Sequence, residues 1–162
     1  MRPREFKSTL QKVRIPADAQ VDHYLSKHHP DPARRRAQRP LAYEWSNLRY
    51  GDASVNSRKG NLDEAVLDPY EVGEGWFALD GALELTITEA CPPAERGRAA
   101  FTIKTLGLSK GRVAKRLRQH FLDRYEREVK NGMDPVSALS QLDSDAPLLA
   151  DYLRTMPVAV AP

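Results

Sequence analysis

The strongest periodic pattern in this chain lies in its second half, between residues 96 and 130. Apolar residues recur there at helical spacing in two runs, which predicts two consecutive helices with a joint at Leu108-Ser109-Lys110. Ser109 is the expected N-cap of the second helix, since a serine side chain accepts from the first free backbone N–H groups. Two further short amphipathic helices are expected at residues 136–142 and 147–153. The longest helices of the fold are therefore expected in the second half of the chain.

Short strands and turns are expected ahead of these helices. Residues 21–25 form a β-prone run, and residues 26–40 combine prolines and arginines without apolar periodicity, which predicts a loop. Residues 41–48 lead into a second strand, and Ser54 is the expected N-cap of a helix over residues 55–65. Residues 76–79 and 82–88 are expected to pair as a hairpin across Asp80-Gly81. Strands followed by helices are typical of an α+β fold.

Charge is distributed unevenly along the 162 residues, although the net charge is only +3. Residues 1–60 hold 13 Lys and Arg against 6 Asp and Glu, a net charge of +7, whereas residues 61–95 hold none against 9, a net charge of −9. Residues 96–130 hold 11 against 3, a net charge of +8. Two basic blocks on either side of an acidic one are typical of a nucleic-acid-binding protein, and they are also compatible with ordinary solvated faces.

Other features of composition exclude several classes of protein. No stretch approaches the ~20 apolar residues that span a bilayer, so no membrane partner is expected. The basic N-terminus lacks the apolar segment of a signal peptide. The single cysteine, Cys91, excludes an internal disulfide framework and suits a reducing cytoplasm, which is the expected location.

Four side chains between residues 21 and 60 could together hydrolyse a phosphodiester. Asp22 and His23 are adjacent, Asn47 follows an aromatic segment, and Asn56 opens the string Asn-Ser-Arg-Lys-Gly. Magnesium prefers oxygen ligands and keeps several waters, so one carboxylate and one amide are a plausible protein contribution. An imidazole with an ordinary pKa of about 6.5 could take a proton from an attacking water near neutral pH.

The order Asp-His, then Asn-Leu, then Asn-x-x-Lys-Gly resembles the HNH endonuclease motif. The fuller string LAYEWSNL, NSRKG and LDPYEVGEGWFAL is similar to the HNH proteins that accompany retrons and Septu-type anti-phage systems. This resemblance covers roughly residues 20–125. It implies a ββα-metal (HNH) core over residues 21–66, between a basic N-terminal segment (1–20) and an acidic hairpin region (67–95). A helical C-terminal region (96–162) completes the expected architecture.

The resemblance also implies a role for each residue that matches the motif. Asp22 and Asn56 would be the metal ligands for Mg²⁺ or Mn²⁺, His23 the general base, and Asn47 the residue that fixes the loop beneath that base. Activity in prokaryotic defence, and work beside an ATPase partner, are further implications of the family. The substrate is expected to be nucleic acid, with DNA favoured over RNA.

This chain departs from the family in lacking the cysteine pairs that bind a structural zinc. The corresponding positions hold Asp52 and Val55, and one cysteine cannot supply a four-ligand zinc site, so no structural zinc is expected. Packing of Tyr43, Trp45 and Leu48 is the expected substitute that holds the loop. Tyr43 and Trp45 are accordingly expected to be core residues and not platforms for stacked bases.

Basic side chains near the motif are the expected phosphate contacts, because each neutralised phosphate releases counterions. These residues are Arg34, Arg35, Arg36, Arg58 and Lys59. Two other functions remain open. LGLSKGRVAKRLR is similar to a helix-turn-helix, which suggests a non-catalytic DNA-binding protein. The missing cysteines also suggest a degenerate HNH module that serves as a scaffold subunit.

Overall fold

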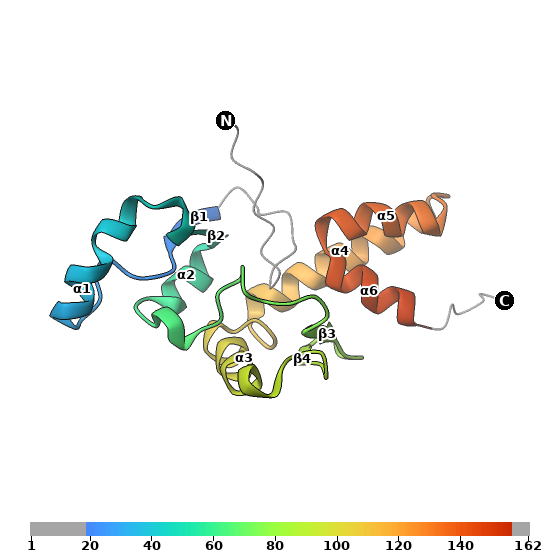
Figure 1. Ribbon diagram of the computed structural model, residues 1–162. Coiled ribbons are helices and arrows are strands. Elements are labelled where there is room, and N and C mark those ends of the chain that lie inside the picture. Colours follow the sequence, from blue (N-terminus) through green and yellow to red (C-terminus); the bar gives the residue numbers. More distant parts are fainter. Residues whose placement is uncertain (1–18, 157–162) are drawn as a thin grey trace.

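The computed structural model describes residues 19–156, which form a mixed α+β fold (Figure 1). Its elements in chain order are β1 (Ala19–His23), α1 (Pro32–Gln38), the 3-10 turns η1 (Pro40–Tyr43) and η2 (Trp45–Asn47), β2 (Leu48–Asp52), α2 (Ala53–Lys59), the 3-10 turn η3 (Asp63–Ala65), β3 (Phe77–Leu79), β4 (Leu85–Ile87), α3 (Pro93–Leu106), α4 (Arg112–Lys130), α5 (Pro135–Asp145) and α6 (Pro147–Thr155). The expected α+β class is confirmed, although α1 and α2 lie between the strands of the first half. Most of the basic N-terminal segment expected over residues 1–20 lies outside the described residues.

Strands β1 and β2 pair antiparallel, and α2 follows β2 directly. His23 lies opposite Leu48, and Asp22 lies opposite Arg49. The expected N-cap at Ser54 is wrong: the carboxylate of Asp52 accepts from the backbone N–H groups of Ser54 and Val55. The helix is also shorter than expected, because Gly60 takes a positive φ of 47° and ends it after Lys59.

The expectation of a loop over residues 26–40 is wrong in its second half, where α1 forms. Asp31 caps this helix by accepting from the N–H groups of Ala33 and Arg34, and Pro32 stands at its first position. Six of the seven residues of α1 are exposed, so the segment shows no apolar periodicity. The cap and the proline were the sequence signal for this helix.

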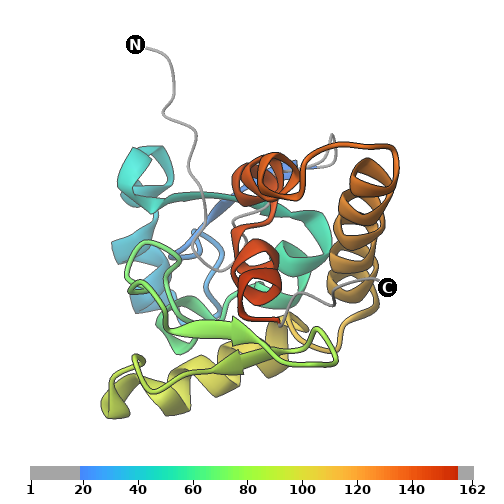
Figure 2. The same cartoon turned by 90° about the vertical axis from the view of Figure 1, so that its right-hand side faces the viewer.

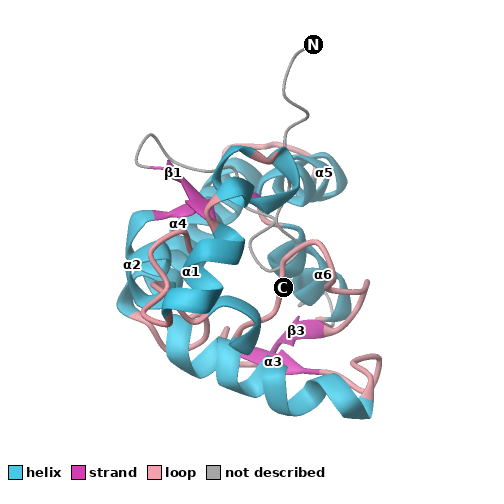
Figure 3. Cartoon of the chain, turned by 60° about the vertical axis from the view of Figure 1, so that its left-hand side comes forward, coloured by secondary structure: helices cyan, strands magenta, loops and turns pink. Residues whose placement is uncertain are grey.

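The acidic region forms the expected hairpin, β3 paired with β4, but with a longer turn. Phe77 lies opposite Ile87 and Leu79 lies opposite Leu85, so the connection runs from Asp80 to Glu84 and not through Asp80-Gly81 alone. The Asp80 carboxylate organises this turn by accepting from the N–H groups of Ala82 and Glu84. The hairpin lies between α3 and α6 (Figure 2) and forms a sheet separate from β1–β2 (Figure 3).

The four C-terminal helices lie close to their expected positions. Gly107, with a φ of 67°, ends α3 in the left-handed conformation, and Gly111 precedes α4. Ser109 is buried between them and does not cap α4, so that expectation is wrong. One apolar cluster joins these helices to the first half of the chain; it includes Tyr24, Val66, Phe77, Leu106, Phe121, Leu142 and Leu149.

Candidate functional site

Asp22 faces α2, where it meets a buried lysine. Its Oδ2 atom lies 2.9 Å from Nζ of Lys59, whose side chain is 9% exposed. The distance defines an ion pair, but the contact lacks hydrogen-bond geometry, so Oδ2 has no hydrogen-bond donor among residues 19–156. The Lys59 ammonium donates instead to the backbone carbonyl of His23 at 2.7 Å. Lys59 therefore ties α2 to the end of β1 and balances the charge of Asp22.

His23 lies on the other face of β1 from Asp22, since consecutive strand residues alternate in direction. Its Nε2 atom lies 3.1 Å from the carbonyl oxygen of Ala42. A carbonyl can only accept, so the ring donates to it from Nε2. This contact orients the ring through Nε2 and does not involve Nδ1.

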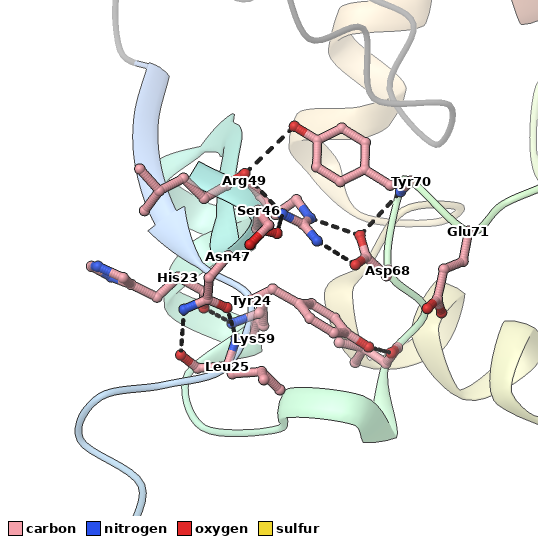
Figure 4. A network of polar contacts seen from close by, with 12 residues as sticks. His23, Tyr24, Leu25, Ser46, Asn47, Arg49, Lys59, Asp68, Tyr70 and Glu71 are labelled. Carbon is pink, nitrogen blue, oxygen red and sulfur yellow. Dashed lines mark hydrogen bonds and ion pairs between the residues drawn. The ribbon is translucent and has the colours of Figure 1, made fainter. Parts of the chain in front are cut away.

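Asn47 is buried and holds both ends of the segment that connects β1 to β2 (Figure 4). Its Oδ1 accepts from the N–H of Leu25 at 2.7 Å, and its Nδ2 donates to the carbonyls of Leu25 at 3.1 Å and Leu41 at 3.2 Å. Leu41 directly precedes Ala42, whose carbonyl receives the ring of His23. The position of Asn47 therefore agrees with the loop-holding role expected for it.

The expected brace of packed aromatic side chains is wrong. Tyr43 is 88% exposed and Trp45 is 70% exposed. Polar contacts take their place: besides Asn47, the buried carboxylate of Asp63 accepts from the N–H of Ser26 at 2.9 Å and from Nε2 of Gln38 at 2.9 Å. Asp63 has a positive φ of 44°, and its role carries no signal in the sequence.

Asn56 lies in α2 against strand β2. A side chain at Gly51 would place its Cβ 3.1 Å from the Oδ1 of Asn56, so the glycine permits this close approach. The Nδ2 atom of Asn56 is buried and has no hydrogen-bond partner among residues 19–156. Gly51 lies opposite Gln20 in the sheet, and paired residues point to the same face. Gln20 and Asp22 are two residues apart on β1 and also share a face, so Gly51 and Asp22 point to the same side of the sheet. The structure therefore places Asn56 and Asp22 on the same side of the hairpin.

The basic residues expected to contact phosphates divide into two groups. Arg58 donates from Nη1 to the carbonyl of Leu106 at 3.0 Å, and a Cβ at Gly107 would collide with its guanidinium, so Arg58 fits the end of α3. Lys59 is buried beside Asp22, and both positions are thus used within the protein. The three arginines of α1 are exposed, although Arg34 pairs with Glu64 at 3.3 Å and Arg35 donates to the carbonyl of Pro30.

Arg49 and Asp68 form a network that the sequence did not suggest. The guanidinium of Arg49 binds both carboxylate oxygens of Asp68, and it lies 4.0 Å from the ring centre of Tyr70 and 5.3 Å from that of Tyr24 (Figure 4). Burial raises the pKa of Tyr24 to about 12, against an opposing effect from Arg98, which donates to its hydroxyl at 2.7 Å. This network fixes strand β2 to the segment ahead of the hairpin.

A metal site built from protein side chains would be sparse. Within residues 19–156, no three His, Cys, Asp or Glu side chains gather closely enough to hold an ion. Oδ2 of Asp22 is paired with the Lys59 ammonium at 2.9 Å, and the buried Asn56 atom without a hydrogen-bond partner is the Nδ2 donor, so binding of a cation would require Lys59 to move away and the Asn56 amide to turn. Which end of the Asn56 amide is oxygen is set by its partners, so an ion can select the carbonyl end.

Three basic residues at the joint of α3 and α4 contact other parts of the protein, two of them through exposed ion pairs. Lys110 and Lys115 pair with Glu84 at 3.3 Å and 3.0 Å. Arg118 is mostly buried and donates to the carbonyls of Leu83, Leu108 and Ser109. These contacts give the similarity to a helix-turn-helix a packing explanation.

Comparison with models of known protein families, with curated proteins and with solved structures finds no match. None of the helices described in residues 19–156 combines the length and the apolar character needed to cross a bilayer.

Proposed function

We propose that this protein is a metal-dependent endonuclease of the HNH type that hydrolyses phosphodiester bonds in nucleic acid. The strand–strand–helix unit from β1 to α2 would be its ββα-metal core, with Asp22, His23, Asn47 and Asn56 in the roles given by the motif. The setting we propose is prokaryotic anti-phage defence in the cytoplasm, beside an ATPase partner.

The observation that carries this proposal is the hydrogen-bonded chain from Asn47 to His23. Asn47 fixes the carbonyl of Leu41, and the next carbonyl, that of Ala42, holds the ring of His23 through Nε2. A backbone carbonyl that orients an imidazole is a contact that suits a general base.

In the proposed reaction, Nδ1 of His23 would accept a proton from the attacking water. Because His23 lies on the opposite face of β1 from Asp22 and Asn56, that water would have to reach the ring around the end of the strand. Asp22 and Asn56 would hold Mg²⁺ or Mn²⁺, which supplies positive charge to the phosphate and leaving oxygens when bound. Lys59 holds the Asp22 carboxylate before an ion arrives and keeps the carbonyl of His23 in place. The α1 arginines would bind phosphates along the strand, since they are the exposed members of the basic set.

Cleavage of nucleic acid with and without a divalent ion tests the proposal. The full chain is incubated with plasmid, linear DNA and RNA in Mg²⁺ or Mn²⁺, with a parallel series in chelator. Strand breaks that require the ion and disappear in His23→Ala support it. A wild-type protein inert on every substrate and ion, yet tightly bound to another protein, would favour the scaffold function instead.

A further inference from the structure

Tyr43 and Trp45 are the two large aromatic side chains with the greatest exposure in the described part of the chain, and both follow Ala42 closely in the sequence. Tyr43 directly follows Ala42, the residue whose carbonyl holds the imidazole, and Trp45 comes two residues later. Their exposed fractions are 88% and 70%. Large aromatic side chains stabilise a protein or a complex most when they are buried. Two exposed rings close to a proposed reaction centre therefore suggest that a ligand covers them.

The segment that carries these rings is rigid. The N–H of Glu44 donates to the carbonyl of Leu41 at 3.1 Å, the N–H of Asn47 donates to the carbonyl of Glu44 at 3.0 Å, and Asn47 anchors the whole segment through its side chain. Both rings therefore project from a fixed backbone and do not belong to a loose loop. A fixed position lowers the entropy cost of binding.

The surroundings of the rings are polar and basic. Residues 24–47, which connect β1 to β2, hold 5 Lys and Arg against 2 Asp and Glu, a net charge of +3. Arg39, Glu44 and Ser46, which lie close to the aromatic pair in the sequence, are also exposed. A protein partner would require a broader apolar interface, whereas single rings within a basic segment suit nucleobases attached to phosphates.

We propose that Tyr43 and Trp45 form a stacking platform for unpaired bases next to the phosphate that is cut, so that the substrate is single-stranded nucleic acid. This inference rests on the proposed nuclease function and specifies its substrate. Bases in a duplex already stack on one another and do not present their faces, whereas the bases of a single strand do.

Binding in chelator tests the platform without dependence on catalysis. The full chain is titrated into a fluorescently labelled single strand, the matching duplex, and an abasic strand of the same length, which keeps the phosphates but lacks bases. Trp45→Ala is expected to weaken binding of the single strand by roughly 5- to 150-fold while binding of the duplex and of the abasic strand stays nearly unchanged. Tyr43→Ala is expected to act in the same direction, and Trp45→Phe to retain most of the affinity.

Tryptophan fluorescence gives a second readout that a merely structural role would not change. The chain has two tryptophans, so Trp45→Phe isolates the signal of Trp76. The single strand is expected to quench wild-type emission and to leave the Trp45→Phe variant unchanged. Both rings are exposed, so these substitutions should leave the melting temperature close to that of the wild type, which serves as the folding control.

Equal loss of single-strand and duplex affinity in Trp45→Ala, or no loss in either, would overturn the platform. The second result would indicate a protein partner for the aromatic pair. Failure of the nuclease proposal can be distinguished from failure of the platform. A protein that binds the single strand through these rings but cuts no substrate would refute the nuclease activity and support the platform. A double variant without both rings that still cuts duplex at the wild-type rate would support the nuclease activity and refute the platform.

Discussion

Removal of the Asn47 side chain should loosen the segment that positions His23 and should cost considerable stability. Asn47→Ala deletes three buried hydrogen bonds, one accepted from Leu25 N–H and two donated to the carbonyls of Leu25 and Leu41. Each such bond contributes roughly 0.5–1.5 kcal/mol net, so the expected loss in the free energy of unfolding is about 2–4 kcal/mol. For a chain of this size, that corresponds to a fall in melting temperature of roughly 5–15 °C.

The loss should be local in origin, and hydrogen exchange can locate it. The amide of Leu25 has the Asn47 carboxamide as its acceptor, so its protection from exchange should fall in Asn47→Ala by more than that of amides in α4. Denaturant unfolding of the full chain measures the free energy, with the slope checked for a constant value. Asn47→Asp is the matched variant: it keeps an acceptor for Leu25 and loses both donors.

The reasoning fails if Asn47→Ala unfolds within about 0.5 kcal/mol of the wild type and the Leu25 amide stays protected. In that case Asp63, which accepts from Ser26 and Gln38, would be sufficient to hold the segment. An unstable protein that retains full cleavage activity at low temperature would separate the two roles, because it would show that the loop matters to folding and not to His23.

Three further predictions follow from the site and its surroundings. Asp22→Ala should lower the free energy of unfolding by about 1–3 kcal/mol, because the Lys59 ammonium keeps its bond to the His23 carbonyl but loses the carboxylate that balances its charge. The double variant with Lys59→Met should recover part of this loss, whereas Mn²⁺ binding measured by titration calorimetry should stay weakened in both variants. The hydrogen bond from the Ser54 hydroxyl lowers the pKa of Asp52 in the folded protein. The ionised carboxylate therefore stabilises the fold above its unfolded pKa of about 3.8, and this stabilisation is lost as pH falls through the lower folded pKa. Asp52→Asn should flatten this acid part of the curve of stability against pH. Charge reversal of the three α1 arginines should weaken binding of single-stranded nucleic acid and reduce its salt slope by about two, and unchanged binding at every salt concentration would make α1 a bystander.

Periodicity predicted the larger elements well and the local ones less well. The helices of the second half each bury an apolar stripe, through residues such as Leu106, Phe121 and Leu142, and this spacing is visible in the sequence. Helix α1 buries only Gln38, so its sole signal was the Asp31-Pro32 cap. Ser54 and Ser109 show the limit of predicting caps from residue type alone. Asp52, and not Ser54, caps the N-terminus of α2, and Ser109 is buried and caps no helix.

The site was only partly predictable, because its contacts join residues distant in the chain. The motif indicated Asp22, His23, Asn47 and Asn56, and in the structure Asn47 forms hydrogen bonds to Leu25 and Leu41. It could not indicate that Lys59 turns inward to Asp22, since a lysine in a short helix is normally solvated. The exposure of Tyr43 and Trp45 was also missed, because an aromatic residue is expected to be buried unless it has an external partner.

The rate of cleavage by His23→Ala tests the central claim most directly. A general base contributes roughly 10²–10⁴-fold to rate, so the variant should lose activity by that factor at saturating Mg²⁺ while its melting temperature and its affinity for nucleic acid stay close to the wild-type values. His28→Ala, an exposed histidine five residues away, is the matched control and should cut at the wild-type rate. Equal rates for His23→Ala and the wild type on a substrate that the wild type cuts would contradict the claim that His23 is the base.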